Sequence, residues 1–112
     1  MYGDRRIIEN VMTINHPAKD QLELPAVLHA LSDPQRLEIV RVLAENATPR
    51  RCSSFGLSVT KSTATHHFRV LREAGVIEQR EEGTARLNSL RRQDLDERFP
   101  RLLDAILESF PA

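Results

Sequence analysis

Residues 60–75 read TKSTATHHFRVLREAG, and this stretch decides the fold. A helical repeat of three and four residues places one set of side chains on a single face: Ala64, His67, Phe68 and Leu71. The opposite face carries hydroxyls, an imidazole and cations: Lys61, Ser62, Thr65, His66, Arg69 and Arg72. The sequence therefore predicts an amphipathic helix with a buried stripe and a cationic, hydrogen-bonding exterior.

Both ends of this predicted helix carry residues that favour helix termini. The Thr60 hydroxyl can accept a hydrogen bond from the amide of Ser62 or Thr63, as an N-cap does. Gly75 favours the left-handed conformation that often ends a helix. Because a helix N-terminus attracts anions, a phosphate would be stabilised near Lys61.

The exterior of this helix has the side chains that hold and read DNA. Arg forms paired hydrogen bonds with guanine, Ser and Thr contact bases or phosphates, and Lys and Arg neutralise the backbone. Residues 48–92 hold nine Lys or Arg and four Glu, a net charge of +5, although the whole chain is balanced at 16 basic and 16 acidic residues. This asymmetry predicts a DNA-binding region on an acidic body, with chance clustering of surface charge as the alternative.

Length and composition limit the rest of the architecture. A chain of 112 residues with 40% hydrophobic residues has room for one domain with one modest core. Residues 1–20 show no sustained apolar period and are expected to be a flexible N-terminal arm before a folded domain over residues 21–112. No membrane span or export signal is evident and Cys52 is the single cysteine, so a reducing cytoplasm is the expected location.

Two helices and a short third helix are predicted before residue 60. The first begins near Gln21, and its apolar side is formed by Leu24, Val27, Leu28 and Leu31. Asp33-Pro34 is a start signal for the second, whose apolar side is formed by Leu37, Val40, Leu43 and Ala44. Thr48-Pro49 repeats that signal, so residues 48–55 are expected to form a two-turn helix ended by Gly56. This third helix and the one after Thr60 form a predicted helix-turn-helix.

The repeat changes after Gly75. Residues 76–80 and 85–90 are expected to be two short strands around a glycine turn, with Ile77 and Leu87 facing inward. Arg80 and Arg86 are available on this hairpin. A hairpin directly behind a DNA-reading helix is typical of a wing.

The last helix is expected over residues 92–110, with Pro100 kinking it or dividing it in two. Its apolar stripe is broad for so small a domain, and it either closes the core of one chain or pairs with a second copy. We favour a homodimer, because two half-sites about one DNA turn apart give a reader of this type useful specificity. The expected dimer interface consists of Leu24, Leu28, Leu102, Leu103, Ile106 and Phe110.

These segments resemble the ArsR/SmtB family of bacterial winged-helix transcription regulators. The resemblance rests on ALSDPQRLEIVRVLAE (residues 30–45), on KSTATHHFRVLREAGVIEQREEG (residues 61–83) and on the order of helices and hairpin, and it covers residues 24–110. It implies a mainly α fold with a small β-hairpin, a winged helix-turn-helix in the order α-α-α-α-β-β-α, in a homodimer. It also implies binding to double-stranded operator DNA with an inverted repeat, usually as a repressor released by an inducer.

Carried onto this chain, the resemblance assigns major-groove contacts to Lys61, Ser62, Thr65, His66 and Arg69, and wing contacts to Arg80 and Arg86. The family's metal sites are not reproduced. Arg50-Arg51-Cys52-Ser53 stands where one site needs a Cys-x-Cys pair, and Leu107 and Phe110 stand where another needs its later ligands. No cofactor is therefore required. A nickel or zinc effector at His16 and His29 is one alternative, and a small organic molecule or a protein is the favoured effector class.

Several residues keep two interpretations. His67 is expected to pack inside with a backbone carbonyl as its partner rather than bind a ligand. Cys52 is expected to be a small core residue rather than a redox- or metal-responsive thiol. Arg50 and Arg51 are equally suited to phosphate contact and to simple solvation.

Two other function classes are alternatives to DNA binding. The chain lacks a glycine-rich phosphate loop, a Gly-x-Ser-x-Gly elbow and a His-Glu-x-x-His motif, so an enzyme is not expected. A winged helix that binds only proteins, or a co-regulator that depends on a partner protein, is the alternative function. The basic exterior of residues 60–75 argues against that alternative.

Overall fold

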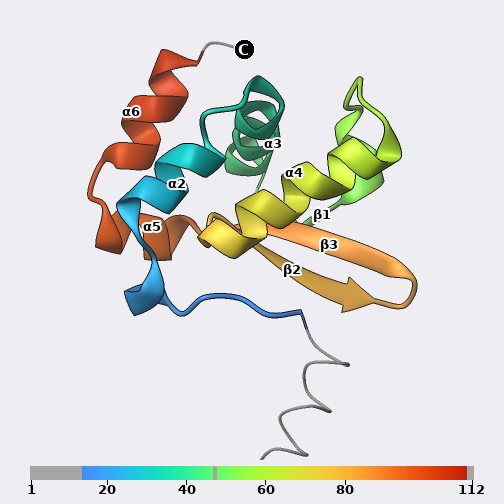
Figure 1. The fold of residues 1–112 in the computed structure, drawn as a ribbon, viewed down its shortest axis with the longest axis horizontal. Helices are drawn as coiled ribbons and strands as arrows, with labels where there is room; N and C mark the ends of the chain where they lie inside the picture. The colour runs from blue at the N-terminus through green and yellow to red at the C-terminus, as the bar shows by residue number, and fades with distance from the viewer. Residues whose placement is uncertain (1–13, 47, 111–112) are drawn as a thin grey trace, which may run out of the picture.

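The structure is a computed structural model that describes residues 14–46 and 48–110. The elements run in the order η1 (Lys19–Gln21), α2 (Leu24–Ala30), α3 (Pro34–Glu45), β1 (Arg50–Arg51), η2 (Cys52–Phe55), α4 (Lys61–Ala74), β2 (Ile77–Glu82), β3 (Ala85–Leu90), α5 (Arg92–Arg98) and α6 (Leu102–Ser109), where η marks a 3-10 turn. Figure 1 shows α4 lying across the β2–β3 hairpin, with α2 and α6 side by side at the end of the molecule opposite the hairpin tip. The predicted mainly α architecture with a winged helix-turn-helix is confirmed.

Helix α4 begins and ends where the sequence predicts. The Thr60 hydroxyl accepts a hydrogen bond from the Thr63 amide at 3.2 Å. At the other end Gly75 has a φ of 85°, and the amides of Gly75 and Val76 donate to Arg72 and Leu71. This pair of bonds is a Schellman motif, which satisfies the last carbonyls of the helix.

The predicted two-turn helix over residues 48–55 is wrong. Arg50 and Arg51 pair with Asn88 and Leu87 of β3, and only the single 3-10 turn of η2 follows before Gly56, whose φ is 64°. Strand pairing with β3 therefore outweighs the Thr-Pro start signal, as tertiary contacts often outweigh local propensity. The predicted hairpin is thus part of a three-stranded antiparallel sheet in the order β1-β3-β2.

The register of the hairpin differs from the prediction on one strand. Ile77 is fully buried as predicted, opposite Leu90. Leu87 is only half-buried, because it lies opposite Arg80 on the outer face of the sheet, and Asn88 is buried in its place. The Gln79 side-chain amide donates to Asn88 Oδ1 at 2.7 Å, so a polar pair holds this part of the inner face.

The core combines the predicted apolar sides with residues that the prediction missed. Six residues of the predicted apolar sides are buried: Val27, Leu31, Val40, Leu43, Phe68 and Leu71. Ile39 is also buried, although the sequence pattern did not predict it. Leu37, Ala44 and Ala64 are only partly buried. In α2 the predicted apolar side is divided, because Leu24 and Leu28 remain 42% and 44% exposed.

Pro100 divides the last helix into α5 and α6, as predicted, and Arg101 takes a left-handed conformation with a φ of 66° at the break. Leu103 is 3% exposed within the single chain, so little of its side chain is left for the predicted dimer interface. Its side chain is part of the chain's own core, together with Leu95.

Part of the expected N-terminal arm is tied to the domain. Residues 1–13 lie outside the described residues, but the Pro17 carbonyl accepts from Arg91 Nη1 at 2.7 Å and Lys19 pairs with Glu97 at 2.5 Å. Residues 14–20 are therefore not a free arm, and the folded domain begins before residue 21. Within residues 14–46 and 48–110, the helices are too short or too polar to cross a membrane.

Candidate nucleic-acid interface

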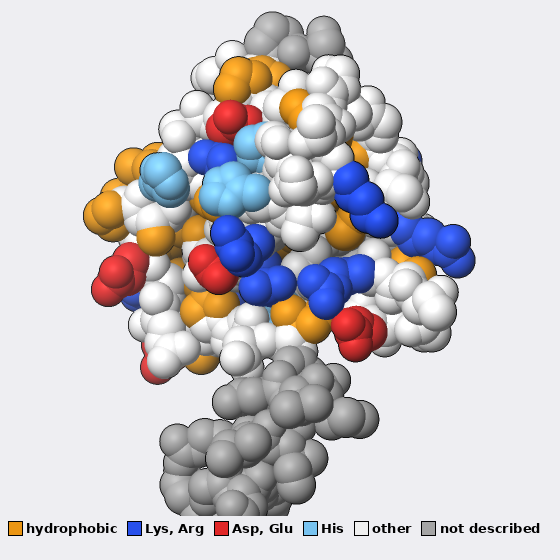
Figure 2. Space-filling view, turned by 45° about the vertical axis from the view of Figure 1, so that its right-hand side comes forward, with side chains coloured by type: hydrophobic (Ala, Val, Ile, Leu, Met, Phe, Trp, Pro, Cys, Tyr) orange, Lys and Arg blue, Asp and Glu red, His pale blue; other side chains and the backbone are white. Residues whose placement is uncertain are grey.

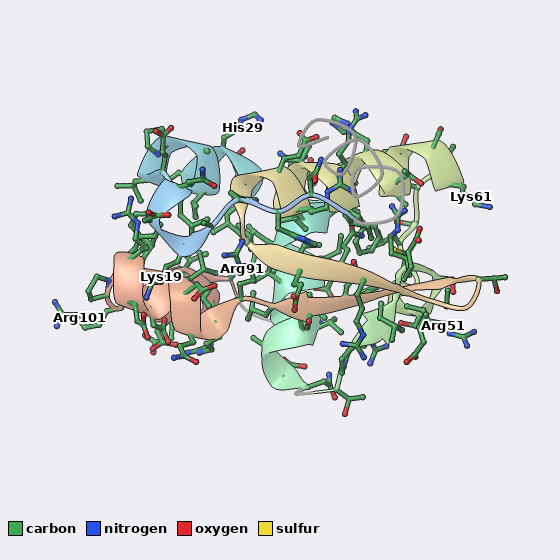
Figure 3. The ribbon with its side chains drawn as sticks, turned by 90° about the horizontal axis from the view of Figure 1, so that it is seen from below. Lys19, His29, Arg51, Lys61, Arg91 and Arg101 are labelled. Carbon is green, nitrogen blue, oxygen red and sulfur yellow. The ribbon has the colours of Figure 1, made fainter. Side chains whose placement is uncertain are left out.

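The exterior of α4 is exposed as the sequence predicts. Every residue of the predicted major-groove set is exposed: Lys61, Ser62, Thr65, His66 and Arg69. Lys61 is the first residue of α4, and Figure 3 shows it projecting at one end of the molecule. It forms no ion pair with any described residue. Figure 2 shows Lys and Arg side chains gathered on one face beneath a group of His side chains.

Two side chains of this face lie against each other. Arg69 Nη2 is 3.3 Å from His66 Nδ1, so a cation and an imidazole are presented together. The Thr65 hydroxyl donates to the Lys61 carbonyl at 2.9 Å and keeps its lone pairs for an incoming donor. This combination offers both donors and acceptors to base edges.

Arg72 differs from the rest of the predicted exterior. Its side chain is only 17% exposed, and its Nη1 donates to Gln79 Oε1 at 3.1 Å. The placement of Arg72 on the exterior was therefore wrong, and its guanidinium instead joins α4 to β2.

The wing is less cationic than its two arginines indicate. Arg86 forms an ion pair with Glu81 at 3.1 Å, because the β2–β3 register places these residues opposite each other. Arg80 is exposed and pairs with no described acid. Because it is unpaired, Arg80 is the better placed of the two wing arginines for a phosphate, although Glu78 and Glu82 are exposed on the same strand.

Arg50 and Arg51 have different surroundings, so the choice between phosphate contact and simple solvation differs for the two residues. Arg50 lies over the Phe55 ring at 5.4 Å and donates to the Ser54 carbonyl at 2.9 Å. Arg51 is exposed on the outer face of the sheet, in one row with Leu87 and Arg80. Figure 3 shows Arg51 and Lys61 projecting at the same end of the molecule, so Arg51 joins the candidate phosphate contacts.

A buried polar cluster behind the wing was missed by sequence reasoning. Gln79 and Asn88 are 2% and 0% exposed, and the Asn88 side-chain amide donates to the Arg50 carbonyl at 3.0 Å and to Cys52 Sγ at 3.2 Å. Cys52 itself is half-buried. Nothing in the sequence marks this cluster, because Gln and Asn on short strands are usually exposed.

His16 has a defined place in the fold. Its Nε2 accepts a hydrogen bond from the Gln79 backbone amide at 2.9 Å. Burial lowers the pKa of His16, with Arg91 and Arg72 acting in the same direction and Glu78 opposing them. The neutral ring thus caps the open edge of β2, and Nε2 is already occupied by a protein donor.

The described part of the chain contains no group of three His, Cys, Asp or Glu side chains arranged to hold a metal ion. His29 is exposed on α2. His67 is buried as predicted, but its predicted carbonyl partner is wrong: its Nδ1 lies 3.1 Å from Arg36 Nη1.

Known proteins resemble this chain in both sequence and fold. Residues 33–79 match the family described as "Bacterial regulatory protein, arsR family". The HTH-type transcriptional regulator YceK of Bacillus subtilis (strain 168) is 33% identical over 82 residues, which cover 71% of this chain and 82% of YceK.

Two solved structures share the fold at lower identity. The transcriptional repressor BigR from Xylella fastidiosa has a TM-score of 0.60 and 24% identity, over 79% of this chain and 86% of that one. The homodimeric winged helix-turn-helix DNA-binding domain of Mb0332 from Mycobacterium bovis also has a TM-score of 0.60 and 24% identity, over 76% of this chain and 78% of that one.

The match to the family, the identity to a regulator over most of its length and the shared winged fold agree with the capped, cationic helix and its hairpin. The chain belongs to the ArsR family of bacterial regulatory proteins and is a transcriptional regulator with a winged helix-turn-helix DNA-binding fold, not an enzyme.

Proposed function

We propose that the protein is a repressor-like regulator that binds an inverted-repeat operator as a homodimer, with α4 in the major groove. One observation carries the proposal: the predicted reading residues of α4 are all exposed on a helix whose buried side is fixed in the core. Arg80 and Arg51 then contact phosphates beside the groove, whereas Arg86 first has to leave Glu81.

A second copy of the chain is proposed to cover α2 and α6. Leu24 and Leu28 are exposed, and a groove of about 420 Å³ runs between α2, α3 and α6, bordered by Leu28, Leu37, Ile106 and Phe110. The proposed interface consists of Leu24, Leu28, Leu102, Ile106 and Phe110. Mb0332, which has the same fold, is itself homodimeric. Two α4 helices on one symmetric dimer would meet two half-sites of an inverted repeat.

The effector is proposed to be a small organic molecule or a protein, with no cofactor required for folding or for DNA binding. Nickel or zinc is the alternative. Because His16 Nε2 already accepts the Gln79 amide, a metal bound through that nitrogen would first have to displace this bond.

The experiment is a titration of the chain with duplexes from its own upstream region and with unrelated duplexes, at several salt concentrations. The proposal expects a preferred duplex bound at least about 10³-fold more tightly than unrelated DNA. Repeating the titration with nickel, zinc, a chelator and a reductant tests the metal alternative. Equal affinity for every duplex, or none at low salt, would favour the alternative of a protein-interaction module or partner-dependent co-regulator.

A further inference from the structure

Arg36, near the start of α3, is a buried cation at the meeting point of three helices. Its side chain is held by carbonyls at the end of α2, with Nε donating to Ala30 at 2.7 Å and Nη2 donating to His29 at 3.2 Å. Its third contact is Nη1 to His67 Nδ1 of α4 at 3.1 Å. The residue is 7% exposed and forms no ion pair with any described carboxylate.

These three acceptors explain how the charge is tolerated. The carbonyls at a helix C-terminus carry partial negative charge, which stabilises a cation there. His67 can accept at Nδ1 only when that nitrogen has no proton, so the neutral ring carries its proton on Nε2. Nε2 faces Asp33 Oδ1 at 3.9 Å, and the same oxygen already caps α3 through the amides of Gln35 and Arg36.

We infer that Arg36 and neutral His67 are a positioning pair that sets recognition helix α4 against the end of α2, so that protonation of His67 lowers operator affinity. The inference rests on the proposed function. Through Arg36 and His67, the end of α2 is connected to α4. Helix α2 carries the exposed leucines, and the outer face of α4 carries His66 and Arg69.

Protonation changes the pair in a defined way. A proton on Nδ1 would point at the Arg36 guanidinium, so a donor would replace the acceptor and two cations would be 3.1 Å apart. Other charged or titratable groups near the ring are Asp33, the N-cap of α3, and His66 on α4, and α2, which packs against α4, carries the exposed His29. Asp33 attracts a protonated ring, but its oxygen is farther from the ring than the Arg36 guanidinium and already accepts two amides.

The test compares three proteins: the chain with His67, His67→Gln and His67→Leu. All three carry His66→Gln, so that the neighbouring ring, an expected DNA contact, cannot contribute to any change of affinity with pH. The glutamine amide oxygen in His67→Gln can accept from Arg36 but cannot become charged, whereas the leucine side chain in His67→Leu offers no acceptor. Operator affinity is measured between about pH 7.5 and about pH 5.5 at constant ionic strength, with circular dichroism confirming that each protein is folded.

The His67 protein is expected to lose about tenfold in operator affinity as the pH falls, and His67→Gln to keep its affinity across the range. His67→Leu is expected to bind weakly at both ends. If His67→Gln loses affinity with pH as the His67 protein does, the inference is overturned. It is also overturned if a folded His67→Leu binds like the His67 protein at every pH.

A readout without DNA separates this inference from the proposed function. In the free protein near neutral pH, nitrogen-proton correlation spectra of the histidine rings are expected to show His67 protonated on Nε2 only. A proton on Nδ1 would overturn the pair even if operator binding is found. If no duplex binds, the proposed function fails and the ring spectrum still decides whether the pair exists.

Discussion

Arg72 Nη1 donates to the Gln79 side-chain oxygen at 3.1 Å, and this bond joins the last turn of α4 to the first strand of the wing. Gln79 also donates to Asn88, and its backbone amide donates to His16. The recognition helix, the hairpin and residues 14–17 are thus connected by buried or half-buried hydrogen bonds. Under the proposed function, DNA at α4 would therefore meet a wing that is held at a fixed position.

Arg69→Ala is expected to weaken binding to the preferred operator by about 1–3 kcal/mol and to relax its sequence preference, because Arg69 is exposed on α4 and is proposed to bond a base edge. Lys61→Ala is expected to weaken binding to all duplexes alike and to lower the salt slope by about one. Fluorescence anisotropy at several salt concentrations measures both effects.

Lys19→Ala is the control for these two variants, because Lys19 projects at the opposite end of the molecule from Lys61 (Figure 3). Its affinity and salt slope are expected to match those of the unchanged protein. A uniform loss in all three variants would place the DNA elsewhere.

Glu81→Gln is expected to strengthen binding to any duplex and to steepen the salt slope by about one, because Arg86 loses its partner at 3.1 Å and becomes available to phosphate. Glu82→Gln removes the same charge from an exposed residue that pairs with no described cation. If both variants strengthen binding equally, the gain comes from net charge alone and Arg86 takes no part.

The recognition helix could be predicted almost residue by residue, since a strong period and two clear terminal signals agree there. The ends at Thr60 and Gly75 and the exposed set from Lys61 to Arg69 are all found in the structure. Arg72 was misplaced because its orientation depends on Gln79, a residue on another element. A helical period identifies a face, but it does not show which neighbour covers the edge of that face.

The parts that could not be predicted depend on contacts between distant segments. Residues 50–51 pair with β3 across almost forty positions, and neither local propensity nor spacing shows this. The Glu81–Arg86 pair depends on the register of the hairpin. The predicted register was wrong by one residue on β3, where Leu87 was expected to face inward and Asn88 does so instead. Of the candidate interface, the charges on α4 were therefore predictable and the partial neutralisation of the wing was not.

Gly75→Ala is expected to lower the free energy of unfolding by about 2–5 kcal/mol. Its φ of 85° is unfavourable for any other residue, and an added methyl group would lie 2.0 Å from Leu22 Cδ2, which is buried. Urea denaturation followed by circular dichroism measures the loss. Gly56→Ala is the matched control, since its φ is 64° but no atom lies within 4 Å of the added group. Equal losses at the two positions would mean that Leu22 makes no tight contact.

The contribution of His16 to stability is expected to depend on pH. Because burial lowers its pKa from 6.5, the folded state favours the neutral ring. The stabilisation is therefore complete above about pH 6.5 and is lost as the pH falls through the lowered folded value. Melting temperatures of the unchanged protein and His16→Gln should differ most above that pH and converge below it. His29→Gln, at an exposed position, should show no such convergence.

Leu28→Asp and Leu103→Asp are expected to act on different equilibria, although both residues were first assigned to one interface. Leu28 is 44% exposed, so a carboxylate there can remain hydrated in a folded monomer and is expected to prevent only the pairing of two chains. Leu103 is 3% exposed, and a buried, unpaired carboxylate there is expected to cost at least about 4 kcal/mol of folding free energy. Sedimentation velocity and thermal unfolding distinguish the two outcomes. An unchanged sedimentation coefficient for Leu28→Asp would mean that the exposed leucines of α2 do not face a second copy.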